Sequence, residues 1–195
     1  MIRLALLRHG HTAWNRAGCI QGRSDIPLDD QARKELRGYA LPADWTQADL
    51  WSSPLMRAAE TAELITGRAP STAHELTEMD WGDWEGLHGQ DLKADPASGF
   101  RDIENWGWHY RPPGGETPAE VWTRIEPWLR SLTRDTVAVC HIGIMRMILA
   151  RAHGWDFDGP APFRIKRNRL FVVEISGSAL MPWPEPVRLI RKAAP

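Results

Sequence analysis

Residues 2–12, IRLALLRHGHT, join a short apolar run to a cluster of basic and imidazole side chains. Residues 2–7 are almost entirely apolar, a pattern typical of a strand that is buried on both faces of a sheet. The run stops abruptly at Arg8, His9, Gly10 and His11. The spacing of His9 and His11 is also found in metal sites, so this stretch fits either a metal pair or a histidine nucleophile beside a bystander.

The rest of the chain alternates strand and helix patterns. Apolar runs typical of strands occur at residues 48–51, 136–140, 170–175 and 187–190. Apolar residues at helical spacing occur at residues 29–39, 54–66, 117–132 and 144–152. This alternation predicts an α/β fold, a three-layer α/β/α sandwich around a mostly parallel central sheet, with an antiparallel edge strand late in the chain.

Capping residues predict where two of the helices begin. Ser53 is expected to cap the helix at residues 54–66, with Pro54 at its first position, because proline fits the first helical turn. Thr117 and Glu120 have the spacing of a capping box at the start of the helix at residues 117–132.

Length, charge and cysteine content limit the class of protein. The 195 residues fit a single domain, residues 1–195, without internal repeats. With 24 Lys and Arg against 25 Asp and Glu, no overall field attracts nucleic acid or an anionic membrane. Cys19 and Cys140 lie far apart, as expected of free thiols in a reducing compartment, and no stretch reaches transmembrane length. We therefore expect a cytoplasmic protein; its oligomeric state stays open, with a homodimer as one alternative.

An irregular segment at about residues 80–116 interrupts the pattern and is rich in tryptophan. The whole chain has 11 Trp against 4 Phe and 2 Tyr. Only residues 90–94 of the segment suggest a short helix, and irregular stretches of this length in a compact domain are usually functional. We expect the segment to lie over the site, with Trp106 and Trp108 as candidates for the wall of a substrate pocket. For most of the tryptophans, packing against the sheet is the preferred interpretation.

Three of the predicted strands lead to arginine or histidine side chains. LALLRHG ends on Arg8 and His9, VAVCHIG ends on His141, and Arg57 follows the strand at residues 48–51 after a short distance. The functional crevice of an α/β sheet lies at the carboxyl ends of its strands, so these side chains should meet if the strands are parallel neighbours. Two arginines and two histidines at one edge, in a chain without a basic excess, indicate an anion site.

Such a site suits the chemistry of a phosphate ester. An arginine fork binds two phosphate oxygens and stays charged at physiological pH. A neutral imidazole can attack phosphorus and carry the phosphoryl group, while the second histidine acts as a charged donor. The leaving group needs an acid with a raised pKa. The stretch HELTEMDWGDWEG offers five carboxyl groups without choosing among them: Glu75, Glu78, Asp80, Asp83 and Glu85.

Six blocks along the chain resemble, in order, those of the histidine phosphatase superfamily, phosphoglycerate mutase-like branch. They are LLRHGHTAWN, QGRSDIPL, SSPLMRAAETA, ELTEMDWGDWEG, PPGGET and AVCHIGIMR. The resemblance implies that His9 is the phosphorylated nucleophile and that Arg8, Arg57 and His141 form the phosphate pocket. It also implies a phosphate contact by Asn15, Glu78 as the acid, and no metal or other cofactor. Substrate contacts are further expected at three residues inside the blocks, Gln21, Gly22 and Ile142.

The resemblance leaves the activity open between phosphatase and mutase. Phosphoglycerate mutases of the family are usually longer and carry paired arginines in the middle insertion, whereas Arg101 and Arg111 are apart here. This favours a phosphomonoester hydrolase acting on a small phosphorylated metabolite. Phosphoglycerate mutase and the α-ribazole phosphatase of cobalamin biosynthesis are the alternatives. The family most often has Glu where this chain has His11, to which we assign no role.

Two remote alternatives belong to other functional classes. A metal-dependent hydrolase would use His9, His11 and His141, but no further ligand follows His11 closely. A non-catalytic protein would bind a phosphorylated ligand in the same pocket without turning it over. Every catalytic position that the resemblance implies is filled, which argues against the second alternative.

Overall fold

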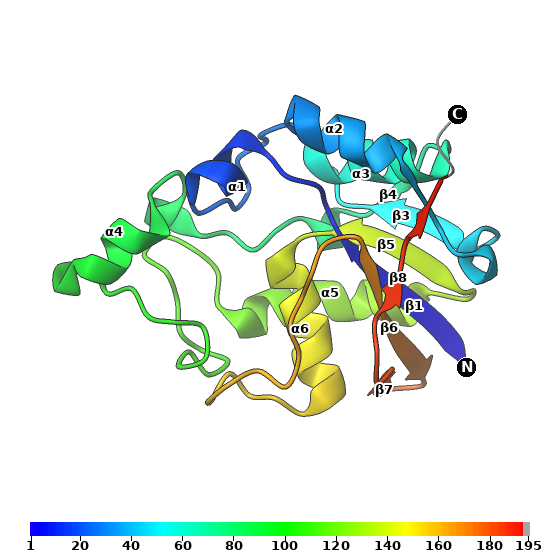
Figure 1. Ribbon diagram of the computed structural model, residues 1–195. Helices are drawn as coiled ribbons and strands as arrows, with labels where there is room; N and C mark the ends of the chain where they lie inside the picture. Colours follow the sequence, from blue (N-terminus) through cyan, green and yellow to red (C-terminus); the bar gives the residue numbers. More distant parts are fainter. Residues whose placement is uncertain (193–195) are drawn as a thin grey trace.

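The computed structural model describes residues 1–192 and places one main β-sheet between two layers of helices (Figure 1). The strand order is β4-β3-β5-β1-β6-β7, and β8 also pairs with β6. These strands are β1 (Ile2–Arg8), β3 (Asp49–Ser52), β4 (Ser71–Thr72), β5 (Thr136–Cys140), β6 (Arg169–Ser176), β7 (Ala179–Pro182) and β8 (Val187–Arg188). A small second sheet joins β2 (Tyr39–Ala40) to β9 (Ile190–Arg191). The predicted α/β sandwich is confirmed.

β1 lies in the middle of the main sheet, between strands from the second half of the chain. It is parallel to β5, with Arg8 opposite Cys140, and antiparallel to β6, with Leu7 opposite Leu170. β3 is parallel to β5 as well. The carboxyl ends of β1, β3 and β5 therefore meet at one edge, and β6 begins at that same edge.

The antiparallel part of the sheet is larger than the single edge strand that the sequence predicts. β6 is followed by a hairpin that returns as β7, and the connection contains Gly177 with a positive φ of 60°. β7 was not predicted because its residues are half-exposed or exposed, so the strand carries no continuous apolar signal. β6 is consequently covered on its outer side and is not an edge strand.

Two pairs of helices cover the two faces of the sheet (Figure 1). α2 (Asp30–Arg37) and α3 (Met56–Thr66) pack on the face that holds Ala5 and Leu7. α5 (Pro118–Ser131) and α6 (Ile142–His153) pack on the face that holds Leu4 and Leu6. Both faces of β1 are thus buried, which explains its nearly unbroken apolar sequence. Within residues 1–192, no helix combines the length and the apolar character needed to cross a membrane.

One of the two predicted helix starts is confirmed and the other is wrong. The capping box is present, because Thr117 accepts from the amide of Glu120 and the Glu120 carboxylate accepts from the amide of Thr117. In contrast, α3 begins at Met56, and its N-cap residue is Leu55, which makes no side-chain capping bond; the Asp25 carboxylate accepts from the amide of Met56 at 2.8 Å. The Ser53 hydroxyl, which was expected to cap α3, accepts from the amide of Leu55 at 3.3 Å, before the helix begins, and lies 2.7 Å from the imidazole of His141.

The segment at residues 80–116 contains short helical pieces separated by irregular chain. They are the 3-10 turns Gly82–Trp84 and Pro96–Ser98, and α4 (Gly89–Ala94), which confirms the short helix predicted at residues 90–94. α4 lies near the short helix α1 (Ala13–Ala17) at one end of the molecule (Figure 1). An isolated bridge between Cys19 and His88 links the two regions.

Candidate active site

The three chain segments predicted to meet at the carboxyl edge of the sheet do meet. The amide of His9 donates to the carbonyl oxygen of Cys140 at 3.0 Å, and the amide of Ser53 donates to Val139 at 3.0 Å. His141 follows β5 directly, and Arg57 lies in the first turn of α3. Parallel pairing of three neighbouring strands is therefore what brings these side chains together.

The two imidazole rings face each other inside the protein. His9 and His141 are both buried, and their ring centroids are 5.1 Å apart. The Nδ1 atom of His9 lies 2.6 Å from the carbonyl oxygen of Gly10. A carbonyl oxygen can only accept, so Nδ1 carries the proton and Nε2 keeps its lone pair. Burial, followed by the charges of Arg57, Arg8 and Arg167, holds the pKa of His9 well below its usual value.

His141 is also neutral, and its proton can be placed. Arg57 donates from Nε to the Nδ1 atom of His141 at 3.2 Å. A guanidinium only donates, so Nδ1 is unprotonated and Nε2 donates to the Ser53 hydroxyl at 2.7 Å. Burial, then Arg57 and His9, hold the pKa of His141 well below its usual value. His141 is therefore neutral in this state, and its role as a charged donor to the transferred phosphoryl group stays a prediction.

Arg57 is held in a fixed orientation by the main chain. Its guanidinium is fully buried and donates to the carbonyl oxygens of Gly22 at 2.6 Å and Ser24 at 2.8 Å. Gly22 thus contributes its carbonyl group, while a Cβ atom at this position would overlap the carboxylate of Glu85. The main chain of the block that contains Gly22 therefore fixes the position of the Arg57 guanidinium.

Burial separates Glu78 from the other four carboxyl groups of its stretch. Glu78 is 2% exposed, and its two oxygens accept from the amides of Met79 at 2.8 Å and Gly143 at 3.1 Å. Burial raises the pKa of Glu78 despite these hydrogen bonds. At Glu85 burial also acts to raise the pKa, but hydrogen bonds from Ser24 and Arg23 outweigh it and the pKa is lowered. Glu78 is thus the carboxyl group best suited to hold a proton.

Positive charge is concentrated around the two histidines. The Nε atom of Arg8 is buried without a hydrogen-bond partner among the described residues, and burial followed by Arg167 lowers the pKa of Arg8 to about 9. Arg146, on α6, is also close enough to affect both Arg8 and Glu78. Several partly buried guanidinium groups beside a single buried carboxyl group, among residues 1–192, give this region an excess of positive charge that suits an anion.

Asn15 and Gln21 form one hydrogen-bonded group, which Arg167 links to the main chain of His9. The side-chain Nδ2 of Asn15 donates to Gln21 Oε1 at 3.1 Å, and the Thr12 hydroxyl donates to the same oxygen at 3.0 Å. Arg167 joins them, since it donates to Asn15 Oδ1 at 2.9 Å and to the carbonyl oxygen of His9 at 3.1 Å.

Arg167 is a residue that the sequence analysis missed. It precedes β6, and because β6 is antiparallel its start lies at the same edge as the ends of the parallel strands. The basic run of residues 164–169 before a predicted antiparallel strand was the signal that could have found it. Ile142, another predicted contact, is half-buried at the first position of α6, next to His141.

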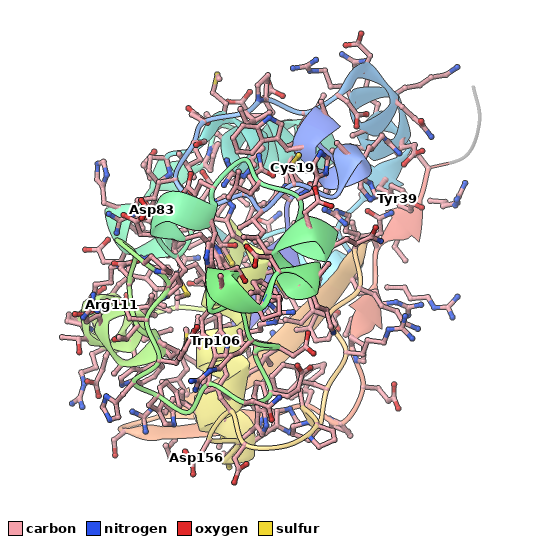
Figure 2. The ribbon with its side chains drawn as sticks, turned by 90° about the vertical axis from the view of Figure 1, so that its left-hand side faces the viewer. Cys19, Tyr39, Asp83, Trp106, Arg111 and Asp156 are labelled. Carbon is pink, nitrogen blue, oxygen red and sulfur yellow. The ribbon has the colours of Figure 1, made fainter. Side chains whose placement is uncertain are left out.

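Trp106 and Trp108 lie in packed surroundings. Trp106 is buried among Trp81, Trp84 and Tyr110, and its indole donates to the carbonyl oxygen of Arg101. Figure 2 shows Trp106 near the centre of the view, with Asp83 and Arg111 to its left. Trp108 donates to Asp156 and lies under the guanidinium of Arg151. These contacts agree with the packing interpretation, and the role of both residues as a pocket wall stays a prediction.

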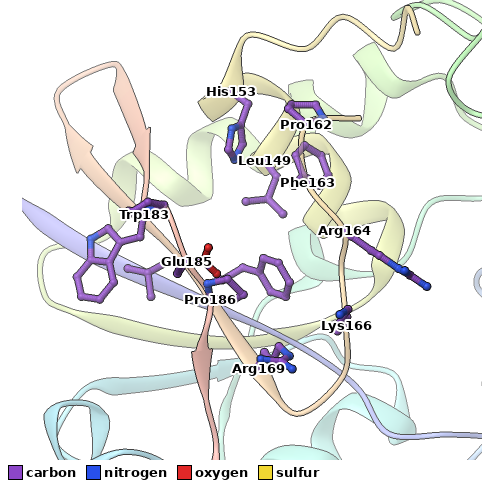
Figure 3. A pocket seen from close by; sticks show the side chains of 13 residues that line it. Leu149, His153, Pro162, Phe163, Arg164, Lys166, Arg169, Trp183, Glu185 and Pro186 are labelled. Carbon is purple, nitrogen blue, oxygen red and sulfur yellow. The ribbon is translucent and has the colours of Figure 1, made fainter. Parts of the chain in front are cut away.

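An open space next to Asn15 is lined by residues of α1 and α4 and by the residue that flanks each helix. This cavity measures about 420 Å³ and is bordered by Asn15, Arg16, Ala17, Gly18, His88, Gln90 and Asp91. A second cavity, of about 310 Å³, lies beside β6 (Figure 3). Arg164, Lys166 and Arg169 line it, together with His153 and Trp183. The side chain of Arg167, which lies between Lys166 and Arg169 in the chain, donates instead to the carbonyl oxygen of His9.

His11 does not join His9 and His141 as a ligand set. It is half-buried, and burial followed by Arg167 and Arg16 lowers its pKa. Across residues 1–192, no three His, Cys, Asp or Glu side chains are grouped in a way that could hold a metal ion.

The fold and the site together define an α/β protein in which arginine side chains surround two buried, neutral histidines. The chain belongs to the histidine phosphatase superfamily (branch 1), whose sequence profile matches residues 4–180. This membership confirms the resemblance of the six sequence blocks.

Individual relatives include both phosphatases and mutases. The chain is 27% identical to the adenosylcobalamin/alpha-ribazole phosphatase of Escherichia coli, over 90% of this chain and 91% of that protein. It is 28% identical to a 2,3-bisphosphoglycerate-dependent phosphoglycerate mutase of Gloeothece citriformis, over 79% of this chain and 80% of that one. The crystal structure of phosphoglycerate mutase from Thermus thermophilus superposes with a TM-score of 0.70 at 31% identity and covers 100% of both chains.

Proposed function

We propose that this protein is a metal-independent phosphomonoester hydrolase that acts on a small phosphorylated metabolite through a phosphohistidine at His9. The observation that carries the proposal is the state of His9. Its Nδ1 proton is directed to the Gly10 carbonyl group, and its Nε2 lone pair remains available inside a cluster of arginines. An imidazole in this state can attack an anion whose charge the arginines bind.

The proposed reaction has two steps. In the first, His9 Nε2 forms a bond to phosphorus while the bond from phosphorus to the ester oxygen breaks. The electron pair stays on that oxygen, which takes the proton of Glu78. In the second step water attacks the phosphohistidine, returns a proton to Glu78 and frees His9 and inorganic phosphate. Arg8 and Arg57 stabilise the charge of the phosphoryl oxygens in both steps.

The contacts of Arg101 and Arg111 favour hydrolysis over mutase activity. The guanidinium of Arg101 stacks on the ring of Tyr110 at 4.7 Å, and Arg111 forms an ion pair with Glu120. Both arginines are therefore engaged within the chain, and they do not form a pair that could hold a second acidic group of a phosphoglycerate. The α-ribazole phosphatase activity named for the Escherichia coli relative is the specific alternative to test.

A phosphatase panel with a parallel mutase assay tests the proposal. Phosphate release is measured with phosphoglycerates, α-ribazole phosphate, nucleotides and sugar phosphates, with and without a chelator. We expect release from at least one monoester, unaffected by the chelator and without exchange of phosphoglycerate isomers. Isomer exchange faster than phosphate release would establish a mutase, and inhibition by the chelator would establish a metal-dependent hydrolase.

Two further expectations belong to the same proposal. Cys19 and Cys140 are free thiols, which supports a reducing compartment such as the cytoplasm. Both hydrophobic cores pack against one sheet, which supports a single domain.

Replacing Gly143 with alanine should lower the rate of hydrolysis without unfolding the protein. A Cβ atom at Gly143 would overlap the Glu78 carboxylate, so the acid must move away from the position where it protonates the leaving group. We expect kcat to fall by about 10-fold or more, since small displacements of catalytic groups cost this much. Gly89→Ala is the matched control, because its nearest neighbour would be the Gly18 carbonyl oxygen at 4.0 Å. Equal rates for the two variants would contradict the role of Glu78.

A further inference from the structure

Arg167 connects the nucleophile to the amide pair of Asn15 and Gln21. It lies 158 residues after His9 in the chain, and its Nε donates to the carbonyl oxygen of His9 at 3.1 Å. Its terminal nitrogen donates to Asn15 Oδ1 at 2.9 Å. One planar guanidinium therefore holds two parts of the site at a fixed distance from each other.

The contact with Arg167 determines which way both amides point. A guanidinium only donates, so Asn15 must turn its oxygen to Arg167 and its NH2 group to Gln21. Gln21 then has to accept, which it does through Oε1, and the same oxygen accepts from the Thr12 hydroxyl. The NH2 group of Gln21 is left free as a result.

That NH2 group is the second observation that points to a ligand. The Nε2 atom of Gln21 is buried and has no hydrogen-bond partner within residues 1–192. The Nε atom of Arg8 is in the same condition. A buried donor without an acceptor is unfavourable, so these two donors, one beside His9 in the chain and one bonded to Asn15, indicate that an acceptor-rich anion completes their bonding.

We propose that Arg167 is a positioning residue of this site, which orients Asn15 and Gln21 so that Gln21 Nε2 donates to an oxygen of the transferred phosphoryl group. The inference rests on the proposed function and adds to it a residue outside the six sequence blocks. Arg167 also contributes charge, because burial and then Arg16 lower its pKa only to about 10 and it stays protonated at neutral pH.

Variants of Arg167 and Gln21 test this positioning role. Arg167→Met and Gln21→Leu should each lower kcat/KM for p-nitrophenyl phosphate by about 10- to 100-fold, the worth of a hydrogen bond to a charged group. The double variant should be no worse than the poorer single variant, because Gln21 acts only when Arg167 orients it. Losses that multiply in the double variant, or an Arg167→Met variant as active as the wild type, would overturn the proposal.

The pH profile separates this role from a merely structural one. The charged or titratable groups around His9 are Arg8 on β1, Arg57 on α3, His141 after β5, and Arg167. Removing the charge of Arg167 favours the imidazolium form, so the pKa of His9 rises and the acidic limb of kcat/KM moves to higher pH. Arg167→Lys keeps the charge, so it should leave this limb in place while restoring kcat/KM only in part. An unchanged limb in Arg167→Met would contradict the placement of this charge beside His9.

Controls distinguish failure of this inference from failure of the proposed function. Arg169→Met, two residues further on, removes an arginine that lines the cavity beside β6 and should keep wild-type kinetics (Figure 3). If Arg167→Met does not fold, the cycle is run with Arg167→Lys, which cannot hold two acceptors in the same fork geometry. Absence of a phosphohistidine on the wild-type protein refutes the proposed function. A phosphohistidine on the wild-type protein together with wild-type kinetics of Arg167→Met refutes only this inference.

Discussion

Replacing His9 with alanine is expected to lower phosphomonoester hydrolysis by about 10⁴-fold or more, to the background rate. The variant loses the Nε2 lone pair, and no other side chain of the site offers a neutral nitrogen in the same place, because the Nδ1 lone pair of His141 is occupied by Arg57. The rate is measured with the best substrate of the panel, and circular dichroism with thermal unfolding shows whether the fold is retained.

The phosphoenzyme provides the direct measurement for the same variant. Wild-type protein quenched during turnover should carry a phosphate that is labile in acid and stable in base, and His9→Ala should carry none. His11→Ala is the matched control, since His11 is half-buried in the same stretch and lies outside the proposed reaction. A loss of activity in His11→Ala as large as that in His9→Ala would revive the metal-pair interpretation.

Replacing Glu78 with glutamine is expected to lower kcat by about 10²- to 10⁴-fold, the usual contribution of general acid catalysis. Burial raises the pKa of Glu78, so the acid stays protonated to a higher pH than an exposed carboxyl group. Activity should decline as pH rises through that pKa, and the Glu78→Gln variant should lack this basic limb. The full pH profile of kcat for both proteins provides the measurement.

The leaving group gives an independent check on Glu78. p-Nitrophenolate leaves without a proton, so Glu78→Gln should lose much less activity on p-nitrophenyl phosphate than on an alkyl phosphate. In Glu78→Gln the side-chain NH2 group also faces the backbone N–H of either Met79 or Gly143, so one donor there is left unpaired. We expect this to lower the free energy of unfolding by about 1–3 kcal/mol. Glu75→Gln, a half-buried neighbour in the same stretch, is the control. Equal losses on the two kinds of ester would show that Glu78 is not the acid.

The sequence predicts those residues of the site that follow parallel strands, because the carboxyl ends of parallel strands lie at one edge of the sheet. His9 and His141 follow strands whose buried apolar sequences are unmistakable, and parallel pairing leaves their ends together. The acid is different, because spacing does not choose among the five carboxyl groups of one stretch, and only the resemblance to the family points to Glu78. Only the packing of the chain makes Glu78 the buried one.

Other parts of the site depend on partners that are distant in sequence. The protonation of His141 follows from a hydrogen bond with Arg57, 84 residues away. Arg167 enters the site because β6 is antiparallel, so that the residues before this strand, and not those after it, reach the functional edge. The resemblance of the six blocks ends at about residue 150 and therefore gave no indication of Arg167.

The central position of β1 has a consequence for how the protein acquires its activity. β1 is made first along the chain, yet both of its partners in the sheet come from residues 136–176. Pairings between such distant segments form slowly, because a long loop must close before they are gained. A chain that has placed His9, Arg57 and His141 still lacks the support of Arg167 until β6 docks against β1. Competence for turnover should therefore be among the last properties to appear on refolding, later than helical structure.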